Sequence, residues 1–67
     1  MLIYLNGEGK EIPDGLNLAQ LIDDLGLPAQ RVAVELNRTV VRRRDWSTTN
    51  LSENDWIEVV HFVGGGA

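Results

Sequence analysis

Residues 17–28 read NLAQLIDDLGLP, and this stretch carries the strongest helix pattern in the chain. Asn17 is a good N-terminal cap, and Gln20 stands three positions on, where its side chain completes a capping box. Gly26 suits the left-handed residue that ends a helix, and Pro28 prevents continuation. Four apolar residues between these signals share one helical face by their spacing of i, i+3, i+4 and i+7, and they are Leu18, Leu21, Ile22 and Leu25. The stretch predicts one short helix with a single buried face.

A β-hairpin is predicted ahead of this helix. Residues 2–5 are apolar and β-prone, and Asn6-Gly7 follows them directly. Asn-Gly between two extended segments favours a type I′ turn, because both residues tolerate positive φ. We expect the return strand at residues 10–12, closed by the turn at residues 13–15.

Three more strands are predicted after the helix. Residues 31–36 (RVAVEL) alternate in polarity, residues 40–41 follow a turn at 37–39, and residues 56–63 (WIEVVHFV) form the longest β-prone run. This last run is apolar on both faces, so we expect it to be central. The order β-β-α-β-β-β predicts an α+β fold, a mixed sheet with one main helix packed on one face. If the first and last strands are parallel neighbours, the hairpin and helix form the right-handed crossover between them.

Composition restricts the function. The 67 residues suffice for one small domain, and 43% apolar with 24% charged residues are ordinary values for a folded chain. The absence of cysteine excludes disulfides, thiolate metal sites and cysteine nucleophiles, and His61 is the only histidine. A formal charge of −4 argues against nucleic-acid and anionic-membrane partners, and there is no long apolar run. We therefore expect a cytoplasmic, cofactor-free carrier or binding module rather than an enzyme.

The chain ends in Gly64-Gly65-Gly66-Ala67. Glycine has no side chain and adopts almost any backbone conformation, so such a segment can enter a narrow channel in a partner. We expect a folded domain over residues 1–63 and a mobile tail over residues 64–67.

Several short motifs resemble the ThiS family of thiamine-biosynthesis sulfur carriers, which have a ubiquitin-like β-grasp fold. The motifs lie along the whole chain: LNGE at 5–8, PDG at 13–15, RVAVELN at 31–37, WIEVVH at 56–61 and the glycine pair near the end. The resemblance implies a protein substrate rather than a catalyst. It implies that an E1-like, ThiF-type adenylyltransferase uses ATP and magnesium to adenylate the C-terminal carboxylate. A sulfurtransferase or cysteine desulfurase then supplies sulfur for a thiocarboxylate, which a ThiG-type thiazole synthase accepts.

By this resemblance the modified residue is Gly66, with Gly65 adjacent. Family chains end on the second glycine of the pair, whereas Ala67 follows Gly66 here. Three readings stay open: a peptidase removes Ala67, Ala67 is itself activated, or the chain is not competent as it stands. We favour removal or tolerance and take Gly66 as the acceptor.

The last predicted strand has a second face. If Ile57 and Val59 point toward the helix, Val60 and Phe62 lie on the opposite face, beside Ala33 and Glu35. Exposed apolar side chains in such a position favour a docking patch. We expect the partner-binding residues to be Glu58, Val60, Phe62 and Gly64. The alternative is that a loop covers Val60 and Phe62.

The remaining features have structural interpretations. We expect His61 to be a strand residue without a catalytic role, and Trp46 and Trp56 to be packing residues with paired N–H groups. The Arg42-Arg43-Arg44 cluster is expected to be a solvated loop balanced by Asp45 and Glu53, although it could instead meet an acidic partner surface or a phosphate.

Two other functions remain possible from the sequence. One is a molybdopterin-type sulfur carrier, against which the VAVELN strand argues. The other is a β-grasp interaction module whose tail is never activated, for which Ala67 is the best support. The oligomeric state is open, and a carrier role favours a free monomer.

Overall fold

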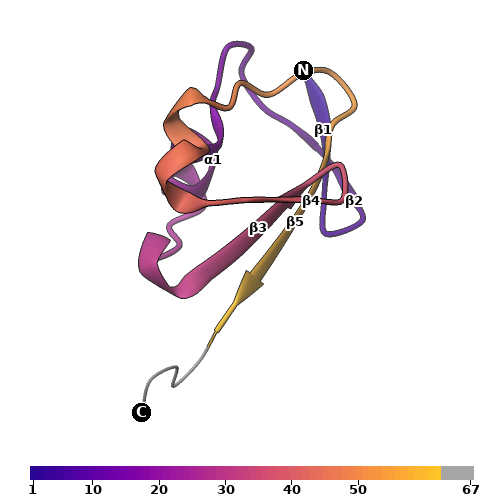
Figure 1. Cartoon of the computed structure of the whole chain (residues 1–67). Coiled ribbons are helices and arrows are strands. Elements are labelled where there is room, and N and C mark those ends of the chain that lie inside the picture. The colour runs from indigo at the N-terminus through magenta and orange to yellow at the C-terminus, as the bar shows by residue number, and fades with distance from the viewer. Residues whose placement is uncertain (63–67) are drawn as a thin grey trace.

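The computed structural model describes residues 1–62, which form a five-stranded mixed sheet with one α-helix packed on one face (Figure 1). The strands lie in the order β2-β1-β5-β3-β4, with β1 parallel to β5 and the other neighbours antiparallel. The α+β architecture and the central last strand are confirmed, and the first and last strands meet the condition of being parallel neighbours. In chain order the elements are β1 (Leu2–Leu5), β2 (Glu8–Glu11), α1 (Leu18–Asp24), the 3-10 helix η1 (Ala29–Arg31), β3 (Val32–Leu36), β4 (Thr39–Val41), the 3-10 helix η2 (Arg43–Thr48) and β5 (Trp56–His61).

The first hairpin is tighter than expected. Asn6 and Gly7 have φ angles of 50° and 86°, as a type I′ turn requires, and Leu5 pairs directly with Glu8. The expected start of the return strand at Lys10 is therefore wrong. A two-residue turn leaves no room for a longer loop, so β2 begins at Glu8.

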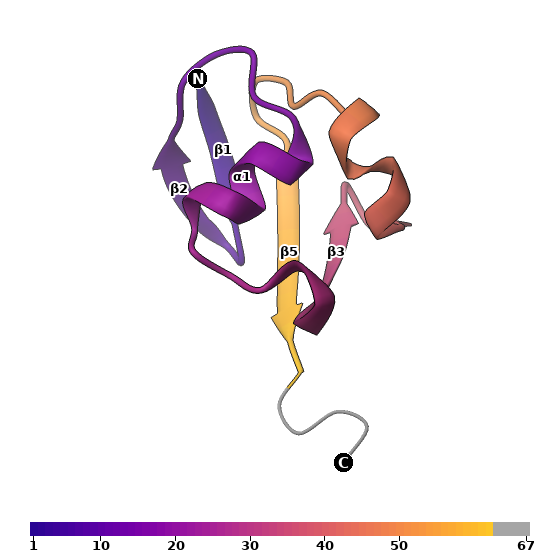
Figure 2. The ribbon, with the colours of Figure 1, turned by 90° about the vertical axis from the view of Figure 1, so that its left-hand side faces the viewer.

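The helix begins and ends where the local signals place it. The Asn17 side chain accepts a hydrogen bond from the Gln20 N–H at 2.8 Å, and the Gln20 side chain accepts one from the Asn17 N–H at 2.9 Å. Gly26 follows the helix with a φ of 71°, a conformation that costs an L-residue roughly 1–2 kcal/mol. Figure 2 looks onto the face of the sheet that α1 crosses, above β1 and β5. The largest fully buried side chains between the two layers are Ile3, Leu18, Leu21, Ile22, Val34 and Ile57.

Two turn asparagines hold the central strand from opposite sides. In the first hairpin, the Asn6 side chain accepts from the Val59 N–H at 2.8 Å and donates to the Val59 carbonyl at 3.3 Å. In the second hairpin, the Asn37 side chain accepts from the Trp56 N–H at 2.9 Å, and the Asn37 backbone N–H donates to the Trp56 carbonyl at 2.7 Å. The two asparagines thus provide hydrogen-bond partners for backbone N–H and carbonyl groups of β5.

We expect Asn6→Gly to lower the free energy of unfolding by about 1–2 kcal/mol, because two hydrogen bonds to Val59 are lost while glycine keeps the positive φ. Asn54→Gly is the matched control, since Asn54 also has a positive φ, of 69°. Urea unfolding of the two variants measures the difference. Equal stabilities would show that the Asn6 side chain does not hold β5.

The amino group of Met1 is part of the fold. It lies 3.0 Å from a carboxylate oxygen of Asp14 and donates to the Ile12 carbonyl at 2.6 Å. The hydrogen bond with Asp14, together with the negative charges of Glu11 and Glu53, raises the pKa of this amino group above its ordinary value of 8.0. These contacts tie the start of β1 to the segment that follows β2.

A raised pKa in the folded state means that the charged amino group adds stability below about pH 8, and that this contribution is lost as the pH rises through the folded-state pKa. For a chain that begins at Met1, we expect the melting temperature to fall between pH 7 and pH 10. In Asp14→Asn the fall is expected to be smaller. Equal falls in both proteins would contradict the role of Asp14.

Candidate docking face and C-terminal segment

Four tail residues with expected roles lie outside the described residues: the acceptor Gly66, its neighbour Gly65, the partner-binding Gly64 and the processed Ala67. So does Val63, the expected end of the last strand. Phe62, the last described residue, is held at the end of η1, where its N–H donates to the Arg31 carbonyl at 2.7 Å.

The outer face of β5 carries the exposed apolar side chains that the alternation predicts. Ile57 is fully buried under α1, whereas Val60 is 59% and Phe62 45% exposed. Val60 pairs with Ala33 across β3 and β5, so both lie on this outer face. Among residues 1–62, no loop buries Val60 or Phe62, and the alternative of a covering loop is not supported within that range. We call Val60 and Phe62 the apolar patch.

Trp56 does not pack in the core. It is 50% exposed on the outer face, where its ring stacks on Tyr4 with centroids 4.9 Å apart. The expectation of a packing residue is wrong because Ile57 takes the inward position, and successive strand residues point to opposite faces. Trp46 behaves as expected: it is 3% exposed, and its indole N–H donates to the Val41 carbonyl at 2.9 Å.

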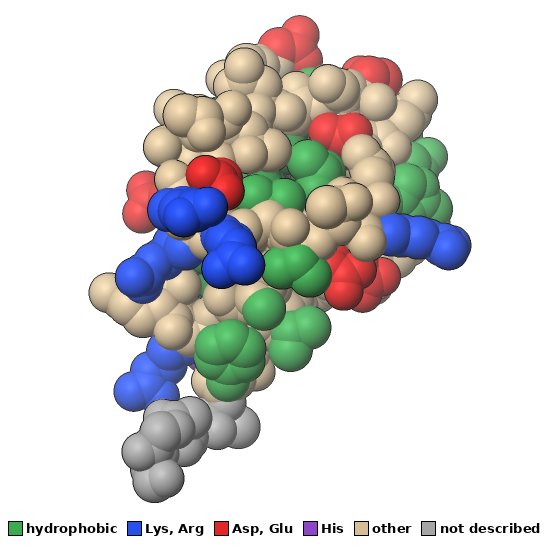
Figure 3. Space-filling model, viewed as in Figure 1, with side chains coloured by type: hydrophobic (Ala, Val, Ile, Leu, Met, Phe, Trp, Pro, Cys, Tyr) green, Lys and Arg blue, Asp and Glu red, His purple; other side chains and the backbone are tan. Residues whose placement is uncertain are grey.

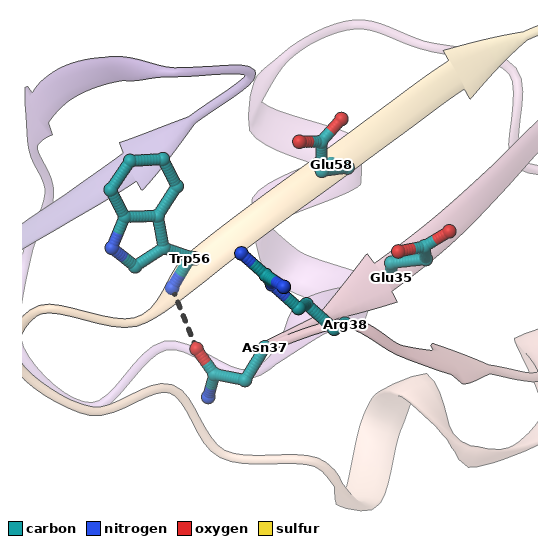
Figure 4. A pocket seen from close by; sticks show the side chains of 5 residues that line it. All are labelled: Glu35, Asn37, Arg38, Trp56 and Glu58. Carbon is teal, nitrogen blue, oxygen red and sulfur yellow. Dashed lines mark hydrogen bonds between the residues drawn. The ribbon is translucent and has the colours of Figure 1, made fainter.

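A shallow hollow lies on the outer face beside Trp56 (Figure 4). Glu35 of β3 and Glu58 of β5 are directly opposite each other in the strand register. Figure 4 shows the Arg38 side chain extending from the turn toward Trp56. The residues that line the hollow are Glu35, Asn37, Arg38, Trp56 and Glu58.

The arginine cluster is exposed at the start of η2. Figure 3 shows basic side chains gathered on this part of the surface, with an acidic group beside them. Arg44 lies 3.6 Å from Asp45 at its closest charged atoms, so the expected balance by Asp45 is present. The expected balance by Glu53 is wrong, since its carboxylate accepts from the Leu2 N–H at 3.1 Å instead. Glu53 lies in the turn before β5, and this turn approaches the start of β1 rather than η2.

His61 is exposed at the end of β5, beside a second hollow lined by Leu5, Asn6, Leu25, Leu27 and Val59. These neighbours include no acid that could orient an imidazole and no nucleophile, so the surroundings favour a structural role. Within residues 1–62 no three metal-ligating side chains come together.

Two relationships on this face were missed from the sequence. The asparagine contacts to β5 had no local signal, because each joins a turn to a strand far along the chain. The pairing of Glu35 with Glu58 had none, because it depends on the register of two strands that are far apart in the chain.

None of the helices in the described range is long and apolar enough to cross a bilayer.

The sequence model of the ThiS family matches residues 3–66, nearly the whole chain. The chain belongs to the ThiS family. A ThiS protein from Geobacter metallireducens has a crystal structure that superposes with a TM-score of 0.85, at 32% identity over 98% of this chain and all of that one. The ubiquitin-like β-grasp fold is confirmed by this likeness.

Curated relatives of this ThiS-family chain include two kinds of protein. The sulfur carrier protein ThiS of Bacillus subtilis is 33% identical over 97% of this chain and the whole of the relative. A thiazole synthase of Magnetococcus marinus is 47% identical over 98% of this chain, and the matched region is 20% of that relative. The chain likewise covers 21% of a thiazole synthase from Paramagnetospirillum magneticum. It thus spans about one fifth of these two relatives.

Proposed function

We propose that this chain is a sulfur carrier of thiamine biosynthesis, a protein substrate and not an enzyme. The observation that carries the proposal is the family match, which extends through Gly64 and Gly65 to Gly66. Residues 1–63 serve as the docking domain, and residues 64–67 contain the reactive end. The match stops before Ala67, which supports Gly66 as the acceptor and removal of Ala67 before activation.

The proposed chemistry makes a stable carboxylate reactive. An E1-like adenylyltransferase transfers AMP from ATP to the Gly66 carboxylate, with magnesium bound by the enzyme and pyrophosphate released. The acyl carbon then has a good leaving group. The terminal sulfur of a persulfide on a sulfurtransferase or cysteine desulfurase displaces AMP and forms an acyl disulfide. A second thiol then attacks the S–S bond, which releases the thiocarboxylate and leaves a disulfide between the two thiols. Because activation consumes ATP, the proposal places the protein in the cytoplasm.

The proposed recipient of the sulfur is a thiazole synthase. Two relatives with that name contain a region like this chain within a protein about five times as long. That arrangement supports a partnership between this domain and the synthase. The outer face of β5 is the proposed docking surface for both enzymes, with Val60, Phe62 and Glu58 in contact and Gly64 entering the active site.

Intact-mass spectrometry tests the proposal. The chain is recovered from its native host, then incubated with the activating enzyme, ATP and a sulfur donor. We expect a species without Ala67 that gains the mass of an oxygen-to-sulfur exchange. If Ala67 persists and neither adenylate nor thiocarboxylate forms with an enzyme active on another carrier, the carrier function is wrong and the interaction module becomes the better interpretation.

A further inference from the structure

Glu35 and Glu58 form a pair of like charges at the centre of the outer face. They face each other directly across the antiparallel strands β3 and β5, and both side chains are exposed. Like charges in this position destabilise a sheet by a few tenths of a kcal/mol up to about 1 kcal/mol. The fold therefore tolerates a small repulsion at this point.

Among residues 1–62, no side-chain cation forms an ion pair with either carboxylate. The ion pairs within residues 1–62 join Met1 to Glu11 and Asp14, and Arg44 to Asp45. Arg38 lines the same hollow without an ion pair to either carboxylate. Residues 63–67 contain no lysine or arginine, so the tail cannot supply a cation either.

The acidic pair lies within an apolar and aromatic surround. Trp56 is two residues before Glu58 on the same face, with one side of its ring against Tyr4. In the other direction the next outward pair is Val60 with Ala33. Aromatic side chains are enriched in protein interfaces, whereas acidic residues are depleted at an interface core. An acidic pair in this surround therefore needs a partner cation once a protein covers it.

We propose that the outer face binds a partner protein that inserts one arginine side chain between Glu35 and Glu58, beside Trp56. The argument for this occupant is charge complementarity. A guanidinium group can bind both carboxylates and stack on an indole, which an ammonium group does less well. The acidic pair adjoins the apolar patch, so a partner bound to the patch covers it. The inference rests on the proposed function, whose activating enzyme is the first partner to test.

The experiment measures binding and stability together in Glu35→Gln/Glu58→Gln. Calorimetry with the activating enzyme reports the dissociation constant, and thermal unfolding reports the melting temperature. We expect binding to weaken about tenfold or more while the melting temperature rises, since the repulsion disappears with the charges. A purely structural pair would lower the melting temperature instead. Glu8→Gln, which removes a charge from the distant edge strand β2, is the control and should leave the dissociation constant unchanged.

Unchanged binding by the double variant, or equal weakening by Glu8→Gln, overturns the inference. Because calorimetry needs no turnover, the inference and the proposed function can fail separately. Binding that depends on Glu35 and Glu58 without any adenylation would contradict the carrier function alone. Normal adenylation, together with a dissociation constant that is unchanged in the double variant, would contradict the inference alone.

Discussion

A chain truncated after Val63 is expected to bind its activating enzyme and form no detectable acyl-adenylate. The truncation removes Gly64, Gly65 and Gly66, which together can span roughly 10 Å of extended chain. The new terminal carboxylate then falls short of a reacting group positioned for Gly66, and reaction rates depend steeply on such placement. The expected effect is therefore complete loss of activation. Intact mass after incubation with enzyme and ATP measures it.

The matched control removes Ala67 alone. A chain that ends at Gly66 is expected to be adenylated at least as fast as the full chain, because Gly66 then carries the free carboxylate. Unfolding curves of both truncated proteins should match that of the full chain in midpoint, since both keep every helix and strand described in residues 1–62. Adenylation of the chain truncated after Val63 would rule out Gly66 as the working end.

Phe62→Asp is expected to raise the KM for the carrier in adenylation about 30-fold or more. Phe62 is 45% exposed beside Val60 and close to the tail, where burial against a partner provides apolar contact. A carboxylate in its place must lose its water on docking, and a surface that fits a phenyl ring offers it no hydrogen-bond donor or cation. The free energy of unfolding should change little, because Phe62 lies after the last residue of β5.

Ser47→Asp is the control for this prediction. Ser47 is exposed in η2, which packs against α1 on the other side of the sheet, so the substitution introduces the same charge away from the outer face. Its KM is expected to stay within about threefold of the original value, well below a hot-spot effect. If Phe62→Asp leaves adenylation unchanged, or if both variants lose it equally, the apolar patch is not the docking site.

The parts of the fold that depend on neighbours in the chain could be predicted from the sequence. The helix ends follow from Asn17 with Gln20 and from Gly26, whose side chains or backbone act within a few residues. The central place of β5 follows from its apolar residues on both faces. These signals are local, so tertiary structure has little opportunity to override them.

The parts that depend on register could not be predicted in the same way. The contact of Asn6 with Val59 joins residues 53 positions apart, and nothing near Asn6 indicates it. The exposure of Trp56 could have been predicted from the sequence. Ile57 was expected to be buried, and successive strand residues point to opposite faces, which places Trp56 on the outer face. Tryptophan is highly buried on average in folded proteins, and this general tendency favoured the wrong assignment.

The parallel pairing of β1 and β5 also determines how the domain resists mechanical load. Leu2 begins β1 at one end of the sheet and His61 ends β5 at the other, so tension between them runs along both strands. The inter-strand hydrogen bonds then bear this tension together in shear and do not open one at a time. A pull between the two ends of the described chain is therefore expected to meet more resistance than it would if β1 and β5 were antiparallel neighbours.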